Sequence, residues 1–331
     1  MLLKNLTEAF GVSGYEREIR ELIKEEVKAY ADELTVDAIG NLIVLKKGVG
    51  ENKKKIMASA HMDEIGFQVI KIEDKGLIKV RGIGGIPVAN SVFNRVTFKN
   101  GTKGIISSTV KIDEIKNDIK KLYIDIGAQT KEEALKYVQV GDVACYDGEY
   151  LELKDDNVVA KALDDRIGCY IAIEALKKLN NSYNDVYFVF SVQEEVGLRG
   201  ATVAAERVKP DLGIALDVTV AHDFPNSGEG SNALGGGTAI KISDGSVICD
   251  EYLVEEMIKC AEENNIKYQR DIIDMGGTDA GAINRSYYGV KAAGISVATR
   301  YVHGPNCFVN MKDTESSIAL LCKYVDREFN F

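Results

Sequence analysis

Five segments of the sequence place histidine or acidic residues directly after apolar ones, where a strand ends or a helix begins. Imidazole and carboxylate groups, with no cysteine among them, are the ligand types that suit zinc, cobalt or manganese. A single acid at such a position is more often a helix cap or a solvated loop residue, but five such positions together predict a metal site. The segments are AHMDE (60–64), LDDR (163–166), QEE (193–195), LDVT (216–219) and YVHG (301–304).

The adjacent residues Glu194 and Glu195 fit the two tasks that a two-metal hydrolytic site needs from carboxylates. One carboxylate binds metal, while a free carboxylate takes a proton from the attacking water. Neighbouring residues at a strand end point in different directions, so each glutamate can take one task. Of the chain's three histidines, His61 and His303 stand at strand ends, whereas His222 is interpreted as a loop histidine or as one that supports a ligand.

Apolar periodicity predicts that alternating strands and helices hold these segments. Apolar residues recur every three or four positions in the expected helices, and continuous apolar runs mark the expected strands. This order is typical of an α/β fold with a mixed sheet flanked by helices, in which the carboxyl ends of the strands line the ligand site. The expected helices span 15–31, 166–181, 198–211, 251–266 and 315–329, and the expected strands include 185–195 and 212–220.

The middle of the chain has a different pattern, of short β runs and turns. Only residues 131–138 suggest a helix there. A β-rich block inside an α/β frame is explained best as a small inserted domain. We therefore expect a discontinuous catalytic α/β domain, formed by residues 1–66 and 156–331, with an inserted β-rich domain at 67–155.

Composition argues against several classes of partner. The 331 residues carry a formal net charge of −10, and no run of Lys and Arg alternates with aromatic residues, so we expect no nucleic-acid binding. No apolar stretch is long enough to span a bilayer, and the first ten residues lack the pattern of a secretory leader. The six cysteines are scattered without a C-x-x-C pair. We therefore expect a reduced, cytoplasmic protein without membrane contact.

Nine motifs, spread over essentially the whole chain, resemble the tetrahedral aminopeptidase family. That family consists of dinuclear-metal peptidases, includes glutamyl and deblocking aminopeptidases, and has relatives labelled as cellulases. The order of AHMDEIGF followed by VQEEVGLRGA is the most specific part of the resemblance. The motifs are GVSGYE (11–16), D-x-x-GN (37–41), AHMDEIGF (60–67), IDIGA (124–128), KALDDRIG (161–168), VQEEVGLRGA (192–201), ALDVT (215–219), GGTDAGAI (276–283) and RYVHGP (300–305).

The resemblance implies two divalent ions per subunit, of zinc, cobalt or manganese. His61, Asp164 and Asp217 would hold one ion. Asp164, Glu195 and His303 would hold the other, so that Asp164 bridges the two.

The resemblance also implies roles for residues that do not bind metal. Glu194 would be the general base, and Asp63 would be the acid that orients the imidazole of His61. Asp164 is preferred to Asp165 as the ligand because the family's motif varies at the second of these positions.

An aminopeptidase that removes N-terminal residues from peptides, using metal-activated water and a glutamate base, is the function that the resemblance implies. It also implies a homo-oligomer, either a dimer or a tetrahedral dodecamer, with the inserted block as the dimerisation domain. The chain departs from the family pattern after Ile106 and after His303, and these departures bear on the substrate pocket and on assembly.

The residues leave other functions to be tested. A dinuclear amidohydrolase acting on N-acyl amino acids would share the metal site. A cellulase would typically use two carboxylates without metal, so a chelator would not stop it. A non-catalytic binding protein is disfavoured because Glu194 is present together with every ligand. Nucleotide binding is disfavoured because GIGGIP (82–87) lacks the Lys-Ser/Thr pair of a P-loop.

Overall fold

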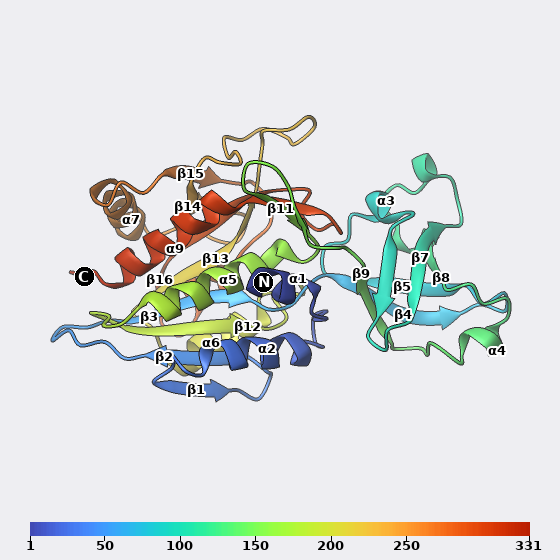
Figure 1. The fold of residues 1–331 in the computed structure, drawn as a ribbon, viewed down its shortest axis with the longest axis horizontal. Helices are drawn as coiled ribbons and strands as arrows, with labels where there is room; N and C mark the ends of the chain where they lie inside the picture. Colours follow the sequence, from blue (N-terminus) through green and yellow to red (C-terminus); the bar gives the residue numbers. More distant parts are fainter.

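The computed structural model describes residues 1–331, and most of them form a large sheet with helices on both faces (Figure 1). The strands follow one another across the sheet in the order β1 (Glu33–Val36), β2 (Leu42–Lys46), β12 (Asp185–Ser191), β3 (Lys55–His61), β13 (Leu212–Val220), β16 (Lys291–Arg300), β17 (Cys307–Asn310), β11 (Asn157–Ala160) and β10 (Leu151–Glu152). Two further strands extend the sheet from β16, namely β14 (Thr238–Ser243) and β15 (Tyr268–Ile272).

The centre of this sheet is parallel. Strands β12, β3, β13 and β16 run in one direction, with Ser191 beside His61 and Asp217 beside Ser296. Nearly all of their side chains are buried, as expected for parallel strands that are covered on both faces. The outer strands β1, β2, β17, β11 and β10 pair antiparallel. The predicted α/β fold with a mixed sheet is therefore confirmed.

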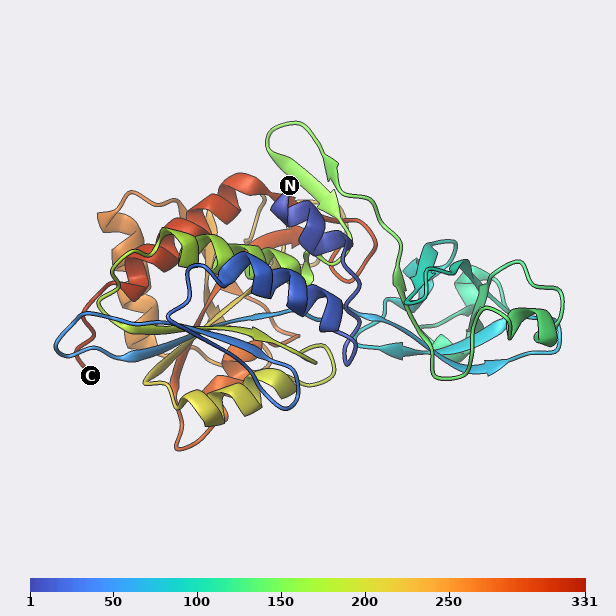
Figure 2. The ribbon, with the colours of Figure 1, turned by 60° about the horizontal axis from the view of Figure 1, so that its bottom comes forward.

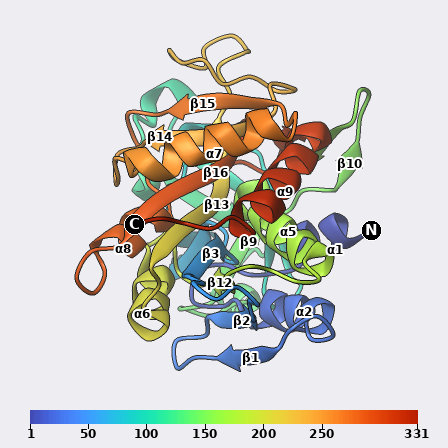
Figure 3. The ribbon, with the colours of Figure 1, turned by 90° about the vertical axis from the view of Figure 1, so that its left-hand side faces the viewer.

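Helices cover the two faces of the sheet (Figure 3). In helix α2, Ile19, Ile23 and Val27 recur every four positions and are buried, so this stripe packs inward. None of the helices combines the length and the apolar character that crossing a membrane requires. One face carries α1 (Leu2–Glu8), α2 (Arg17–Val27), α5 (Leu163–Lys178), α7 (Glu251–Glu263) and α9 (Met311–Val325), and the other carries α6 (Arg199–Val208) and α8 (Asp279–Arg285).

A small closed barrel lies at one end of the molecule, away from the large sheet (Figure 2). Its neighbouring strands are all antiparallel, and alternating residues such as Val96 and Phe98 fill a core of its own. Around the barrel, the strands are β4 (Gly66–Ile72), β5 (Ile78–Ile83), β8 (Leu122–Asp125), β7 (Lys103–Ser108), β6 (Arg95–Phe98) and β9 (Val143–Tyr146). The connections contain α3 (Val88–Ser91), α4 (Lys131–Ala134) and two 3₁₀ turns at 112–114 and 119–121.

The junctions between sheet and barrel involve pairing that the local sequence pattern does not reveal. β10 lies inside the range 67–155 but hydrogen-bonds to β11 of the large sheet, and Gly66 is the first residue of the barrel strand β4. The predicted domain boundaries stay a prediction. Helices α1 and α8 were not predicted, because seven residues give too few repeats for a periodic signal.

Candidate metal centre

The carboxyl ends of the central strands meet at one edge of the sheet, and the predicted site residues lie there. His61 is the last residue of β3, Asp217 lies within β13, and Glu194 and Glu195 follow β12. Parallel strands end at the same edge, so segments that are far apart in the sequence converge. The other two predicted ligands are Asp164, near the start of α5, and His303, in the segment after β16.

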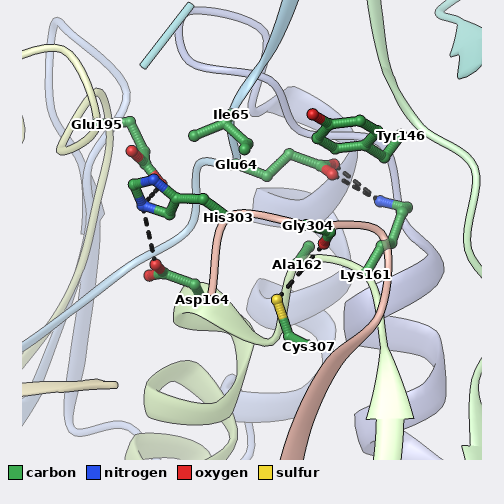
Figure 4. Close-up of a pocket in the computed structure, with 10 residues that line it drawn as sticks. All are labelled: Glu64, Ile65, Tyr146, Lys161, Ala162, Asp164, Glu195, His303, Gly304 and Cys307. Carbon is green, nitrogen blue, oxygen red and sulfur yellow. Dashed lines mark hydrogen bonds and ion pairs between the residues drawn. The ribbon is translucent and has the colours of Figure 1, made fainter. Parts of the chain in front are cut away.

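Asp164 lies between the two histidines, with one carboxylate oxygen toward each. Its Oδ1 lies 3.1 Å from Nε2 of His61, and its Oδ2 lies 3.2 Å from Nε2 of His303 (Figure 4 draws the second contact). The carboxylate of Asp165 is fully buried and accepts hydrogen bonds from the backbone N–H of His61 (3.1 Å) and of Gly168 (2.9 Å). Asp164 is therefore the member of the pair whose side chain faces both histidines.

Three groups of side chains each bring their potential ligand atoms within 4.8 Å of one another. The first group consists of His61, Asp164 and Asp217, and the second of Asp164, Glu195 and His303. The third group, His61, Glu194 and Glu195, shares His61 with the first and Glu195 with the second. In the second group, Oε1 of Glu195 lies 3.4 Å from Nε2 of His303. The structure thus brings together the residues that we predicted for each of two ions, with Asp164 common to the first two groups.

Asp63 lies behind His61. Its buried carboxylate accepts hydrogen bonds from the hydroxyl of Ser13 (2.7 Å) and from the backbone N–H groups of Glu194 (2.9 Å) and Glu195 (3.2 Å). Nδ1 of His61 lies 3.1 Å from the backbone carbonyl oxygen of Asp63 and 3.5 Å from its Oδ1. Asp63 therefore connects the imidazole of His61 to the backbone that carries the two glutamates. We did not predict the part played by Ser13, because no local pattern shows which acid its hydroxyl meets.

The site concentrates buried carboxylates that form no ion pair with a lysine or arginine. Burial raises the pKa of Glu195 to about 7, and it raises the pKa values of Glu194 and Asp217 well above the usual range. No lysine or arginine lines the larger pocket at the site, and Lys161, which lines a smaller cavity beside Asp164 and Glu195, is paired with Glu64. Carboxylates held together out of water are unfavourable unless cations compensate them. Divalent ions would do so, and the donor set of two imidazoles and several carboxylates fits them.

The backbone of Gly85, in the loop between β5 and α3, supports the second histidine. The carbonyl oxygen of Gly85 lies 2.8 Å from Nδ1 of His303. A Cβ atom at Gly85 would lie only 3.0 Å from the same nitrogen, so glycine allows the close approach. When Nδ1–H donates to this carbonyl, Nε2 is left free to bind metal. The sequence does not predict this contact, although the adjacent Gly84 and Gly85 are a signal that the backbone approaches another group closely.

Glu64 belongs to a buried network of charges beside the site. Both of its carboxylate oxygens accept hydrogen bonds from Nζ of Lys161, at 2.9 and 2.8 Å (Figure 4). Nη2 of the fully buried Arg166 lies 3.4 Å from the same carboxylate, and its Nε donates to the carbonyl of Met62 at 2.8 Å. Arg166 also donates to the carbonyl of Ala9 at 3.1 Å. The network holds the chain's first segment against the junction of β3 and β4.

A pocket of about 700 Å³ opens onto the predicted metal ligands and Glu194. It is lined by the ends of the central strands and by the loop that contains Gly85, so both parts of the molecule contribute to it. His222 does not line this pocket. It lies in the loop after β13, where its Nδ1 is 3.1 Å from the carbonyl oxygen of Ser227.

The mixed sheet with histidines and acids at its carboxyl edge, the small barrel and the family match below together place this protein among the metal-dependent peptidases. Residues 40–320 match the model of the M42 glutamyl aminopeptidases, and the chain belongs to this family. It is therefore an aminopeptidase, a hydrolase that acts on peptide bonds with the help of metal.

Individual relatives are similar over nearly their whole length. A relative from Acetivibrio thermocellus is 47% identical over 325 residues, which are 98% of this chain and 97% of the relative. An aminopeptidase structure from the archaeon Desulfurococcus kamchatkensis has a TM-score of 0.93 and 37% identity, covering 98% of this chain and 93% of its own. The TET1 peptidase of Pyrococcus horikoshii has a TM-score of 0.85 and 36% identity, covering 98% of both chains, and can assemble into a tetrahedron or a large octahedral shell.

Proposed function

We propose that this aminopeptidase works with two divalent ions per subunit, drawn from zinc, cobalt and manganese. His61, Asp164 and Asp217 would hold one ion, and Asp164, Glu195 and His303 would hold the other. The observation that carries the proposal is the position of Asp164, whose two carboxylate oxygens lie 3.1 and 3.2 Å from the Nε2 atoms of the two histidines. A carboxylate in this position can bridge two ions.

Glu194 would move the proton in the reaction. The bound ions would supply Lewis acidity to the scissile carbonyl and to the attacking water. Glu194 would take a proton from this water and pass it to the leaving amine, first as general base and then as general acid. Its Oε2 lies 3.8 Å from Nε2 of His61, so the carboxylate reaches the site while lying outside both proposed ligand sets.

Asp63 would act through its neighbours. Its hydrogen bonds to the backbone of Glu194 and Glu195 and its position beside Nδ1 of His61 support a positioning role. Substitution of residues that orient metal-binding histidines in this way typically lowers metal affinity or activity about 10- to 100-fold.

Carboxylates around the site would also restrict cleavage to the first residue of a peptide. The α-ammonium group of a free N-terminus is a cation, and the pocket offers it carboxylate oxygens with no competing lysine or arginine. An acylated N-terminus lacks this charge. The net charge of −10 favours approach of cationic N-termini at low ionic strength.

Removal and return of metal tests the proposed function against its alternatives. The protein is treated with a chelator, and hydrolysis of aminoacyl p-nitroanilides, N-acyl amino acids and cellulose is measured before treatment and after Zn²⁺, Co²⁺ or Mn²⁺ is added back. We expect anilide hydrolysis to disappear with the chelator and to return with metal. Hydrolysis of N-acyl amino acids alone would support an amidohydrolase, and chelator-resistant hydrolysis of cellulose would support a cellulase.

We further propose that the protein is a homo-oligomer, a dimer or a tetrahedral dodecamer, with residues 67–155 as the dimerisation domain. The assembly of the P. horikoshii TET1 peptidase and its similarity to this chain support the proposal. An exposed Phe93 and a half-exposed Ile105 on the barrel surface are suited to an interface.

The six cysteines are all free, which supports the proposed cytoplasmic location.

A further inference from the structure

Apart from its acids and the two histidines, the pocket that opens onto the candidate metal centre is lined by apolar side chains, glycines, a proline and three uncharged polar residues, Asn117, Thr219 and Thr278. Its acidic residues are four, Asp164, Glu194, Glu195 and Asp217, and the proposed function uses every one of them. No lysine or arginine lines it. Seven hydrophobic residues make up much of the remaining wall, namely Ile86, Leu198, Val218, Val220, Ile273, Met275 and Val302.

These apolar residues adjoin the site residues in the chain. Val218 follows Asp217, and Val302 precedes His303. Ile86 follows the glycine whose carbonyl contacts His303. A peptide whose amine and first carbonyl lie among the site residues would therefore have this apolar wall within reach of its first side chain.

Charged residues flank the pocket in the sequence but do not line it. Lys116 precedes Asn117, Asp274 precedes Met275, and both charged residues are exposed. With the four lining acids engaged by metal, proton transfer and the α-ammonium group of the substrate, a charged first side chain, whether a carboxylate or an ammonium, would lose water without gaining a partner. An apolar side chain of similar size would instead gain the free energy of leaving water.

We propose that this aminopeptidase selects peptides that begin with a large, uncharged apolar residue such as leucine, methionine or phenylalanine, an inference that rests on the proposed function. It discriminates against N-terminal glutamate, aspartate and lysine. In this respect the chain would differ from the glutamyl aminopeptidases after which its family is named.

The specificity constants of the metal-loaded protein test this inference. The kcat/KM values are measured for p-nitroanilides of leucine, methionine, phenylalanine, alanine, glutamate, aspartate and lysine. We expect the leucine substrate to exceed the glutamate, lysine and alanine substrates by about 10-fold or more, since each methylene in an apolar pocket contributes roughly 10-fold or more. Calorimetry provides a readout that does not need turnover, and free leucine should bind more tightly than free glutamate or lysine.

The outcomes separate this inference from the proposed function. Hydrolysis of the glutamate or lysine substrate as fast as that of leucine would overturn the inferred preference and leave the aminopeptidase activity in place. Failure to hydrolyse any of the seven substrates with metal present would overturn the proposed function itself, and the inference with it.

A charge introduced into the apolar wall tests where the first side chain lies. Ile273→Arg should raise the ratio of glutamate to leucine kcat/KM by roughly 5-fold, because an exposed ion pair contributes up to about 1 kcal/mol. Met275→Arg, at a position that is 82% exposed and so tolerant of change, should shift the ratio in the same direction. Ile248→Arg is the matched control, since Ile248 is 83% exposed and lies outside the pocket. An unchanged ratio in both pocket variants would contradict the inference.

Discussion

At the scale of residues, the side chains of adjacent acids point in different directions along the backbone and therefore contact different groups. Asp164 directs its carboxylate to two histidines, whereas Asp165 accepts two backbone hydrogen bonds. Glu195 lies 3.4 Å from His303, while Glu194 lies nearer to the other histidine. Single substitutions can therefore test one task at a time.

Glu16 is a buried acid outside the proposed ligand sets that should make stability depend on pH. Burial raises its pKa from 4.5 to about 7, and the nearby charge of Asp63 adds to this shift. The folded state then binds this proton more tightly than the unfolded state does. The protonated Glu16 therefore makes its full contribution to the free energy of unfolding below pH 4.5. That contribution is lost as the pH rises through 7.

We predict that Glu16→Gln stabilises the protein at pH 8 by up to about 3 kcal/mol and has little effect at pH 4.5. The amide keeps an oxygen that can accept the N–H of Gly14 (2.7 Å) and of Gln193 (3.1 Å), so the folded geometry is retained. Melting temperatures of the variant and the parent at the two pH values measure the effect. Equal differences at both pH values would contradict the assignment to Glu16.

At the scale of elements, the sequence predicts what depends on local order and misses what depends on packing. The alternation of strands and helices and the acids at strand ends are visible because each element carries its own period. The contact between Gly85 and His303 joins residues 218 positions apart. The pairing of Ser13 with Asp63 and of Glu64 with Lys161 is also decided only when the elements pack. The sequence pattern of a single segment therefore cannot predict such contacts.

The buried pair of Glu64 and Lys161 holds the junction of β3 and β4, and its loss should be costly. We predict that Lys161→Met lowers the free energy of unfolding by about 3 kcal/mol, because it leaves the Glu64 carboxylate buried with Arg166 as its one cationic partner, at 3.4 Å. Denaturant titration measures the change. Lys312→Met is the control, since Lys312 pairs with Asp156 at 3.0 Å on the surface. It should cost less than about 1 kcal/mol. Equal losses in both variants would contradict a specific role for the buried pair.

At the scale of the whole molecule, the barrel stands at one end and the loop after β5 reaches back to the site (Figure 1). Gly85, Ile86 and Pro87 of this loop line the same pocket as the ends of the large sheet. The position of the barrel therefore affects the pocket as well as the surface available for assembly.

We predict that light scattering of the purified protein gives a mass of two or twelve times 36.2 kDa. Phe93→Asp, at a residue that is 68% exposed on the barrel, should lower this mass, since it places a charge on the proposed apolar interface. Val49→Asp, at an exposed apolar residue between β2 and β3 of the large sheet, should leave the mass unchanged. A parent mass of 36.2 kDa across the micromolar range would contradict the proposed oligomer.

In the proposed mechanism the two adjacent glutamates have different roles, with Glu195 binding metal and Glu194 transferring the proton. The most direct measurement of these roles is the metal content and turnover of Glu194→Gln beside those of Glu195→Gln. We predict that Glu194→Gln keeps two ions per subunit and loses about 10²- to 10⁴-fold in kcat, whereas Glu195→Gln also loses metal. A Glu194→Gln protein that turns over at the parent rate, or that loses its ions, would contradict these roles.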